Sequence, residues 1–555
     1  MKTVELTFGN EGSGGWTPIE GEETNQLISH IGKKWSESER ENLRKSTTHI
    51  LSQCSPPHGP GGRRTGLVVG YVQSGKTASF TAVTAMAADN GYPLIIVLTG
   101  TKNNLQKQSA DRLEEDLQLK TRKKRKWRHL REPGKNEGTA IRQILEDYRD
   151  KDPDGHVALV VLKKHKAVLK KFMAALKGID LNGVPVILID DEADQASLNA
   201  RVNQDEESPT YSQICQLRDL FDNHTFLEYT ATPQANLLIS VLDVLSPQFA
   251  EVIQPGGDYV GGVEFFRGES ASLVRDIPVG ELPVRKGPVG DVPPTLLEAL
   301  RLYFLGVAAG YVTGDEGGNR TMFIHPSRET DLHGEFAFRT RQIMSRWAET
   351  LGFPQDDIDR LDLLDSFKKC YDDLHQTVGE ELPTWDELQA HLRKAIRRAS
   401  VDEVNSVKGS TEIINWGAQY ARVIVGGQAL DRGVTIEGLT VTYMPRGVGT
   451  GAADSLQQRA RFLGYKRSYL GYCRLFLDAS VKGAFNEYVE HEKSLRGELD
   501  KLRDTPVTSW RRVFILSPNL QPTRRNVLSL KHVQATCAHQ WYWVRPLMYL
   551  LMHES

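Results

Sequence analysis

A glycine-rich segment, Gly70-Tyr71-Val72-Gln73-Ser74-Gly75-Lys76-Thr77, constrains the fold of this 555-residue chain more than any other feature. It matches the pattern G-x-x-x-x-G-K-[ST], in which backbone N–H groups surround a phosphate at the start of a helix. The segment follows the apolar run Leu67–Val69 and precedes a helix-forming stretch at 78–88. The sequence therefore predicts a phosphate-binding loop between a strand and a helix of an α/β domain.

The side chains of this loop indicate which phosphate compound it binds. Lys76 places a positive charge where the β- and γ-phosphate oxygens of a nucleoside triphosphate lie, and the Thr77 hydroxyl is a ligand for Mg²⁺. We therefore predict ATP and Mg²⁺ as cofactors, and Lys76 as a catalytic residue. The nucleotide-binding residues predicted within the loop are Gly70, Gln73, Ser74, Gly75, Lys76 and Thr77.

A cluster of carboxylates is predicted to complete this site. The apolar run Val186–Ile189 leads directly into Asp190-Asp191-Glu192-Ala193-Asp194. The carboxyl end of a buried parallel strand lies at the ligand-binding edge of its sheet, beside the phosphate loop. We expect Asp191 to hold Mg²⁺ through water, and Glu192 to orient and deprotonate the attacking water.

The alternation of apolar runs with helical stretches predicts two α/β domains, each with a parallel sheet buried on both faces. The stretch between them is rich in glycine and proline. We expect five parts: an N-terminal helical region and linker (1–60), a first lobe (61–245), a connecting segment (246–320), a second lobe (321–480) with a helical insertion (333–400), and a C-terminal helical extension (481–555).

Composition and charge exclude several classes of protein. With 69 Lys and Arg against 71 Asp and Glu, the net charge of −2 attracts no nucleic acid by itself, so any such contact requires a local patch. None of the five cysteines forms a C-x-x-C pair, which argues against zinc-ribbon, thioredoxin-like and disulfide-rich folds. No run of 18 apolar residues and no signal-like N-terminus is present, so we expect a cytoplasmic protein without a membrane partner.

One dense basic run, Lys120–Arg131, predicts a local patch for nucleic acid. Its cations suit a phosphate backbone, and the Trp127 ring suits stacking on a base. The alternative is a solvated loop, because isolated basic runs are common. The residues predicted to contact nucleic acid here are Lys123, Lys124, Arg125 and Trp127.

Four segments resemble motifs of the superfamily-two helicases, in the same order. Asp191–Asp194 resembles the second motif, and Thr230-Ala231-Thr232-Pro233 resembles the motif that couples the nucleotide to the nucleic acid. Leu430–Ile436 and Gln457–Arg461 resemble the fifth and sixth motifs, which face the nucleotide from the second of two RecA-like lobes. The resemblance thus implies a helicase-type nucleoside triphosphatase with two such lobes.

The same resemblance assigns further residues. It implies that Thr230, Thr232 and Gln458 couple the two ligands, that Asp431 and Gly433 contact the nucleotide, and that Arg461 is a catalytic arginine finger. Gly464 stands where the superfamily has a second arginine, and Lys466 and Arg467 follow as alternative carriers of that charge. Four residues after the ends of strands match positions that grip nucleic acid: Thr99, Gly100, Lys102 and Arg328.

The sequence also resembles the Z1 (Z-one) domain family of bacterial helicase-like proteins, which are often labelled putative endonucleases and occur in anti-phage gene clusters. The segments that carry the resemblance are 64–77, 91–100, 258–262, 322–328 and 461–466. The family implies two RecA-like lobes around ATP and a role with DNA in defence or repair.

We therefore expect an ATP-hydrolysing enzyme of the helicase or translocase type, stimulated by nucleic acid and acting on DNA in anti-phage defence or repair. One alternative is a nucleotide-dependent switch that recruits a separate effector nuclease or a repair-type ATPase. A second alternative is an endonuclease. Against that reading, Val161 stands where a metal-binding carboxylate is required after Pro153-Asp154 and the following strand.

Overall fold

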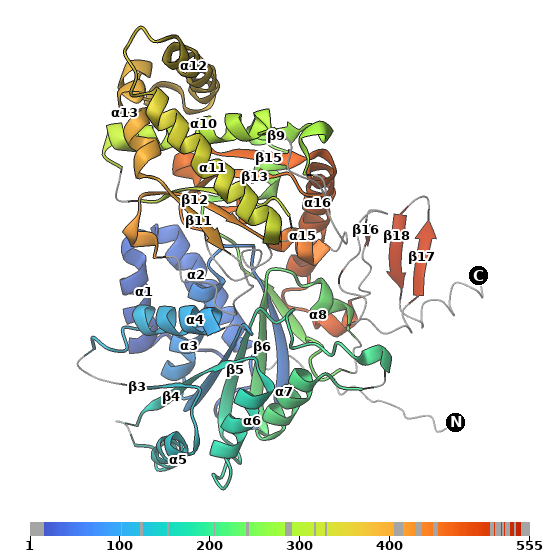
Figure 1. The fold of residues 1–555 in the computed structure, drawn as a ribbon. Helices are drawn as coiled ribbons and strands as arrows, with labels where there is room; N and C mark the ends of the chain where they lie inside the picture. Colours follow the sequence, from blue (N-terminus) through green and yellow to red (C-terminus); the bar gives the residue numbers. More distant parts are fainter. Residues whose placement is uncertain are drawn as a thin grey trace. The chain divides into compact units, whose positions relative to one another are not determined.

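The computed structural model divides the chain into two compact units (Figure 1). Unit 1 comprises Met1–Gly70, Gly75–Gln254 and Leu499–Arg511, and unit 2 comprises Tyr71–Ser74, Pro255–Glu498 and Arg512–Ser555. The structure describes residues 16–101, 103–122, 126–152, 155–204, 206–239, 243–283, 291–315, 318–327, 330–404, 415–427, 436–447 and 453–510, together with 515–516, 523, 527, 533–537 and 540–544.

Unit 1 contains a seven-stranded sheet in the order β3-β4-β2-β5-β6-β1-β7, and every neighbouring pair is parallel. The inner strands β2 and β6 are buried along their whole length. The apolar run of β2 favours such burial, whereas β6 also buries polar side chains, among them His224 and Glu228. The strands are β1 (Arg63–Val69), β2 (Leu94–Thr99), β3 (Trp127–Arg131), β4 (Val157–Lys163), β5 (Pro185–Asp191), β6 (Asn223–Thr230) and β7 (Phe249–Val252).

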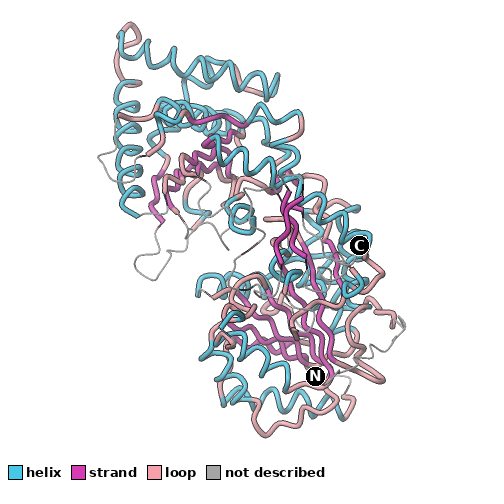
Figure 2. Tube along the Cα trace, turned by 90° about the vertical axis from the view of Figure 1, so that its right-hand side faces the viewer, coloured by secondary structure: helices cyan, strands magenta, loops and turns pink. Residues whose placement is uncertain are grey.

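Helices cover both faces of this sheet (Figure 2). One face packs on α3 and α4, whose Phe80, Val83 and Leu113 share a core with Ile187 and Ile189 of β5. The opposite face carries α5, α6 and α7. The helices are α3 (Lys76–Asp89), α4 (Asn103–Asp116), α5 (Lys135–Arg149), α6 (Lys166–Ala175), α7 (Pro209–Asp219) and the short α8 (Gln234–Leu238).

The N-terminal helices α1 (Glu22–Ile31) and α2 (Glu37–Ser52) pack on α3 and belong to unit 1. The Asp89 carboxylate at the end of α3 accepts hydrogen bonds from the backbone N–H groups of Gly21, Glu23 and Thr24 at 2.9–3.0 Å. These are N–H groups that the first turn of a helix leaves without an internal partner. The predicted N-terminal region is therefore fixed to the first lobe by a cap supplied from the lobe itself.

Unit 2 contains a six-stranded sheet in the order β11-β12-β10-β13-β15-β9, again with parallel neighbours throughout. Two parallel-sheet α/β units confirm the predicted fold class. The strands are β9 (Val274–Ile277), β10 (Arg320–Ile324), β11 (Ser400–Val404), β12 (Ala421–Gly426), β13 (Leu439–Met444) and β15 (Arg474–Asp478); β8 (Tyr259–Val260) and β14 (Gly464–Tyr465) form a separate antiparallel pair.

The helices predicted as an insertion at 333–400 form a layer on this sheet. They connect β10 to β11, and they share one hydrophobic core with α10 and with β10, β12 and β13. The opposite face of the sheet packs on α9, α15 and α16. The helices are α9 (Gly262–Phe266), α10 (Pro294–Thr313), α11 (Thr330–Thr350), α12 (Ile358–Val378), α13 (Trp385–Arg398), α15 (Ala453–Arg459) and α16 (Ala479–Lys501).

The predicted connecting segment 246–320 is divided between the two units. Strand β7 extends the sheet of unit 1, where the Phe249 ring occupies the space that a side chain on Gly66 of β1 would fill. Strand β9 and helix α10 belong to unit 2. Helix α10, with a mean hydropathy of 1.3 over 18 residues, is long and apolar enough to cross a membrane, but 72% of that window is buried inside the protein. Core packing explains its composition.

The C-terminal part differs from the predicted helical extension. After α16, the chain re-enters unit 1 at Leu499–Arg511, where the Val507 N–H donates to the Gln248 carbonyl at 2.9 Å and Arg503 pairs with Glu251 at 3.0 Å. Further on, β16 (Ile515–Leu516), β17 (Val533–Cys537) and β18 (Gln540–Val544) form an antiparallel sheet. Aromatic and β-branched residues favour strands here, which the helical expectation overlooked.

Candidate nucleotide site

Five segments with polar side chains follow the carboxyl ends of strands at one edge of the unit 1 sheet. The phosphate loop follows β1, Thr99 ends β2, Lys164 follows β4, Asp190–Glu192 lies at the end of β5, and Thr230–Thr232 lies at the end of β6. Strand β6 lies between β5 and β1 in the sheet. The strand order therefore brings the loop and the carboxylates to one edge of the sheet, as the sequence predicted.

The loop has the backbone geometry of an anion site. The Gly70 N–H donates to the Thr230 carbonyl at 3.0 Å, which fixes the start of the loop against β6. Gln73 (φ 56°) and Gly75 (φ 92°) adopt left-handed conformations that turn the chain sharply, and α3 begins at Lys76. The N–H groups of Lys76 and Thr77 thus lie in the first turn of a buried helix, where the helix dipole favours negative charge.

Asp191 and Glu192 lie close to this helix terminus. Burial and the neighbouring Glu192 charge raise the pKa of Asp191 to about 6, while the Lys76 ammonium acts in the opposite direction. Lys76 is therefore within electrostatic range of the carboxylate, as the predicted site requires. Among the described residues no group of three or more His, Cys, Asp or Glu forms a metal site. Thr77 and Asp191 fit Mg²⁺, which binds few protein ligands when phosphate oxygens supply the rest.

Glu192 has an unusual backbone conformation for a non-glycine residue. Its φ is 59°, in the left-handed region, just after β5 ends at Asp191. The next N–H, of Ala193, donates to the Tyr229 carbonyl at 3.0 Å, and the Gln195 N–H donates to the Glu192 carbonyl at 2.9 Å. Such conformations cost about 1–3 kcal/mol and persist only where surrounding contacts hold them.

The coupling residues contact the acidic turn directly. The Thr230 hydroxyl donates to the Asp194 carboxylate at 3.0 Å and accepts from the Thr232 N–H at 2.9 Å. All three side chains are buried. This chain of contacts joins the turn after β5 to the turn after β6. Their coupling role stays a prediction. Asp194 had no role in the sequence analysis.

A buried lysine was also missed. Lys164, just after β4, pairs with Asp190 at 2.8 Å, and both side chains are fully buried. Burial raises the pKa of Asp190, and the Lys164 charge opposes that shift. The sequence did contain one indication of this lysine, the carboxylate of Asp190 at the end of an apolar run. A buried carboxylate there needs a counter-ion, but only the order of the strands in the sheet shows that Lys164 supplies it.

The sixth-motif residues are described within unit 2. Gln458 and Arg461, near the end of α15, are 5% and 8% exposed. Lys466 is buried and donates to the Leu439 carbonyl at 2.8 Å, and its burial lowers its pKa. Arg467 is half-exposed, and its Nε donates to the Gly257 carbonyl at 2.9 Å. Of the two alternative cations, only Arg467 keeps a charge at the surface.

The four loop residues Tyr71–Ser74 cluster with unit 2, and their contacts there are aromatic. The Arg496 guanidinium lies 3.7 Å from the centre of the Tyr71 ring, and Arg496 also pairs with Glu492. The Val72 and Ser74 carbonyls accept hydrogen bonds from the hydroxyls of two tyrosines, Tyr259 at 2.7 Å and Tyr465 at 3.1 Å.

Burial argues against three of the predicted nucleic-acid contacts. Trp127 is 7% exposed, packs in the unit 1 core, and donates its indole N–H to Glu23, so its ring does not stack on a base. The Thr99 side chain is fully buried and donates to the Leu162 carbonyl at 3.2 Å, and Gly100 is buried too. Seven predicted site residues lie outside the described part of the chain: Lys102, Lys123, Lys124, Arg125, Arg328, Asp431 and Gly433.

Replacing Trp127 with alanine is expected to destabilise unit 1 by about 3–5 kcal/mol, because a large buried side chain is removed from a packed core. Trp127→Phe, which keeps most of the apolar ring, is the matched control and should lose far less. Urea unfolding followed by circular dichroism measures both. An unchanged midpoint for Trp127→Ala, together with weakened binding of single-stranded DNA, would restore the base-stacking interpretation.

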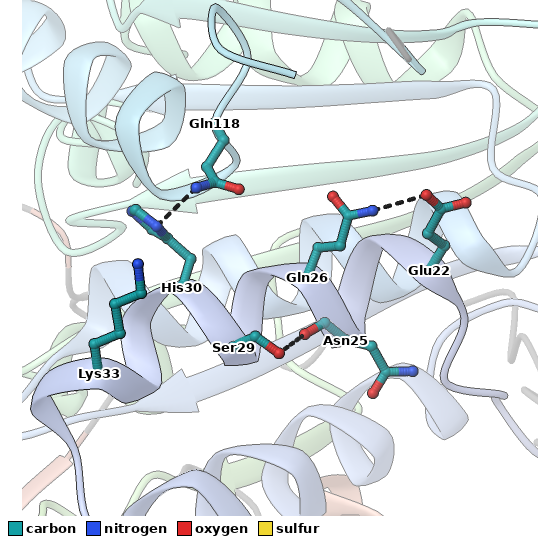
Figure 3. Close-up of a pocket in the computed structure, with 7 residues that line it drawn as sticks. All are labelled: Glu22, Asn25, Gln26, Ser29, His30, Lys33 and Gln118. Atoms are coloured by element: carbon teal, nitrogen blue, oxygen red, sulfur yellow. Dashed lines mark hydrogen bonds between the residues drawn. The ribbon is translucent and has the colours of Figure 1, made fainter. Parts of the chain in front are cut away.

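A polar pocket of about 370 Å³ lies elsewhere on unit 1, beside α1 (Figure 3). Several of its polar groups already bond to one another: Gln118 bonds His30 at 2.8 Å, and Gln26 bonds Glu22 at 2.7 Å. The pocket contains neither the phosphate loop nor the acidic turn, so it is separate from the nucleotide site. Its lining residues are Glu22, Asn25, Gln26, Ser29, His30, Lys33 and Gln118.

Comparison with known families gives one match, most of which lies in unit 2. Residues 295–516 match the model of the Z1 domain family. The match covers α10, the strands β10–β15 and α16, and it does not include the phosphate loop. No curated protein matches the chain.

Three solved structures are similar in outline only. A variant of S. cerevisiae Dbp5 bound to RNA and ADP BeF3 shares 12% identity at a TM-score of 0.39, with 89% of this chain and 99% of that chain covered. Mycobacterium smegmatis helicase Lhr, bound to ssDNA and AMP-PNP, shares 12% identity at 0.40, with coverages of 83% and 50%. The Pyrococcus furiosus Hef helicase domain shares 13% identity at 0.32, with coverages of 82% and 98%. None is close enough to transfer an activity.

Proposed function

We propose that this protein is a helicase-type ATPase whose hydrolysis is stimulated by nucleic acid. The observation that carries the proposal is the meeting, at one edge of the unit 1 sheet, of a glycine-rich loop opening a buried helix with Asp191 and Glu192. A loop of this kind binds the phosphates of a nucleotide, and neighbouring carboxylates supply the metal ligand and the base.

The residues divide the chemistry among themselves. The N–H groups at the start of α3 and the Lys76 ammonium hold the β- and γ-phosphates. Thr77 and Asp191 hold Mg²⁺, which when bound screens the phosphate charge. Glu192 orients a water molecule in line with the γ-phosphate and accepts its proton. The buried Thr230–Asp194 contact carries changes at this turn to the turn after β6.

DNA is the proposed polymer, and anti-phage defence or DNA repair the proposed setting. The support is the Z1 domain match at 295–516 and the ordered motifs of the two units. We propose that hydrolysis drives closing and opening of the two units on the nucleic acid. The basic run from Lys120 contributes through its exposed cations: Lys120 is 78% exposed although it pairs with Glu114.

The test is the ATPase rate of the purified chain alone, with single-stranded DNA, with double-stranded DNA and with RNA. The expected result is an Mg²⁺-dependent rate that rises with DNA. High salt should abolish this rise, because salt screens the contacts between the protein and the DNA phosphates. A rate that no nucleic acid changes would contradict the proposal. If RNA raises the rate and DNA does not, RNA replaces DNA as the proposed polymer.

A strand-displacement assay separates a motor from a switch that recruits a nuclease. The same nucleotide site serves both functions, since each uses ATP binding and hydrolysis to change the conformation of the protein. DNA-stimulated hydrolysis with displacement supports the helicase, whereas hydrolysis without displacement supports the switch or a translocase that does not unwind.

Arg461→Ala is expected to lower turnover about 10³-fold or more while leaving ATP affinity within a few-fold, if Arg461 is the arginine finger. Arg467→Ala is the matched variant, since Arg467 is a half-exposed arginine six residues further along the chain, whereas Arg461 is buried. Steady-state ATPase kinetics and binding of a fluorescent ATP analogue measure the two effects. An unchanged rate for Arg461→Ala with a lowered rate for Arg467→Ala would reassign the finger.

A further inference from the structure

Lys164 makes an unusually complete set of contacts for a buried lysine. Its Nζ lies 2.8 Å from Asp190 Oδ1 and donates to the carbonyl oxygens of Asp191 at 2.8 Å and Glu192 at 2.7 Å. An ammonium has three N–H donors, and three acceptors surround this one. Both members of the ion pair are fully buried, so the protein encloses the arrangement.

The ion pair is not required for packing. Two apolar side chains of similar volume commonly replace a buried ion pair without loss of stability, and sometimes with a gain. Asp190 occupies a strand position whose neighbours in β5, from Val186 to Ile189, are all apolar. A charge at this position therefore has a function beyond filling the core. What Lys164 does that an apolar residue cannot do is bond the two carbonyls of the acidic turn.

Those carbonyls belong to the two residues that carry the proposed chemistry. Glu192 is held at φ 59°, a conformation that a non-glycine residue leaves unless its peptide groups are fixed. The Glu192 carbonyl accepts from Lys164 Nζ and from the Gln195 N–H. Without Lys164 the Glu192 carbonyl keeps only the hydrogen bond from the Gln195 N–H. Glu192 can then relax toward an ordinary backbone conformation, which changes the direction of its side chain.

We propose that Lys164 is a positioning residue, which holds the Asp191–Glu192 turn so that both carboxylates face the phosphate loop. The inference rests on the proposed function, because it assigns Lys164 a part in the same hydrolysis. The Lys164 ammonium group touches neither carboxylate of the pair; it contacts their backbone carbonyls and Asp190. Its loss should therefore affect the chemical step while the loop, built from β1 and α3, continues to bind nucleotide.

The test uses the paired replacement Lys164→Met with Asp190→Leu in the full chain. Lys164→Met alone leaves a buried carboxylate without its counter-ion and is expected to destabilise the protein, whereas the pair removes both charges together. In the double variant kcat for ATP should fall about 10–100-fold, as is typical for residues that orient catalytic groups. KM and the affinity for a fluorescent ATP analogue should change less than about threefold. Lys171→Met, which removes another lysine-to-carbonyl bond (to Glu132, 3.1 Å), is the control.

Hydrogen–deuterium exchange supplies a readout independent of ATP. In the nucleotide-free double variant, the amides of Ala193 and Gln195 should exchange at least about tenfold faster than in the parent, while those of β1 and β2 stay protected. A double variant with the parent kcat, or with unchanged exchange at these amides, overturns the inference. If the parent chain itself lacks Lys76-dependent hydrolysis, the proposed function fails, and the exchange measurement still decides whether Lys164 holds the turn.

Discussion

The Glu192→Gln protein is expected to bind ATP with normal affinity and to hydrolyse it at least about 100-fold more slowly. The substitution keeps the size and the hydrogen-bonding capacity of the side chain but removes the group that accepts the proton of the attacking water. The loop and the start of α3, which hold the phosphates, are unchanged. Single-turnover hydrolysis and binding of a fluorescent ATP analogue measure the two properties separately.

Glu206→Gln is the matched control for this variant. Glu206 lies in the same unit, is mostly exposed, and pairs with Arg201 at 2.9 Å. It should retain the parent rate within about twofold, since an exposed ion pair contributes little. Near-normal turnover in Glu192→Gln would show that Glu192 is not the general base. A protein that no longer binds ATP would instead show that the turn after β5 contributes to nucleotide binding.

The Lys76→Ala protein is expected to lose about 10²–10³-fold in kcat, and to bind ATP more weakly as well. Lys76 opens α3 beside Asp191, and its charge opposes the proton on that carboxylate. Removing it deprives the phosphates of the positive charge of the loop. It also removes one of the two lysine charges, Lys76 and Lys164, that act on the Asp191 carboxylate. Isothermal titration with a non-hydrolysable ATP analogue and steady-state kinetics measure both losses.

This variant also separates the proposed ATPase from the endonuclease alternative. Nicking of plasmid DNA by a self-contained nuclease would survive Lys76→Ala and would depend on a divalent metal. Nicking that disappears with Lys76 would depend on the nucleotide site. Lys171→Ala, on α6 in the same unit, is the control for loss of a lysine. An unaltered ATPase rate in Lys76→Ala would contradict the assignment of the loop.

Local signals made the proposed nucleotide site predictable. The loop from Gly70 to Thr77 combines glycines, a lysine and a hydroxyl at fixed spacing, and its function depends on the backbone that those residues allow. The acidic turn was predictable because an apolar run ended in carboxylates, and parallel strands bring their carboxyl ends to one edge. Both inferences need only neighbouring residues and the general geometry of α/β sheets.

The errors arose where a residue's environment depends on distant parts of the chain. Trp127 lies in a basic run and suggested an exposed stacking platform, but its indole bonds Glu23, which lies 104 residues earlier. The helices predicted as an insertion at 333–400 do lie between β10 and β11, but the sequence did not show that they pack on the same core as α10 and β10. In each case the local sequence pattern was compatible with both a buried and an exposed position. The contact with a distant part of the chain determined which of the two occurs.

Sequence alone determined that this protein has two α/β units, a glycine-rich loop between a strand and a helix, and a strand that ends in carboxylates, because strand, helix and loop signals are local. Tertiary structure alone decided which charges are buried and what they hold. Lys164 is one of many lysines in the sequence. It becomes the counter-ion of Asp190 only because β4, β2 and β5 are adjacent in the sheet. Strand order is set by packing of the whole unit, so no local pattern could contain it.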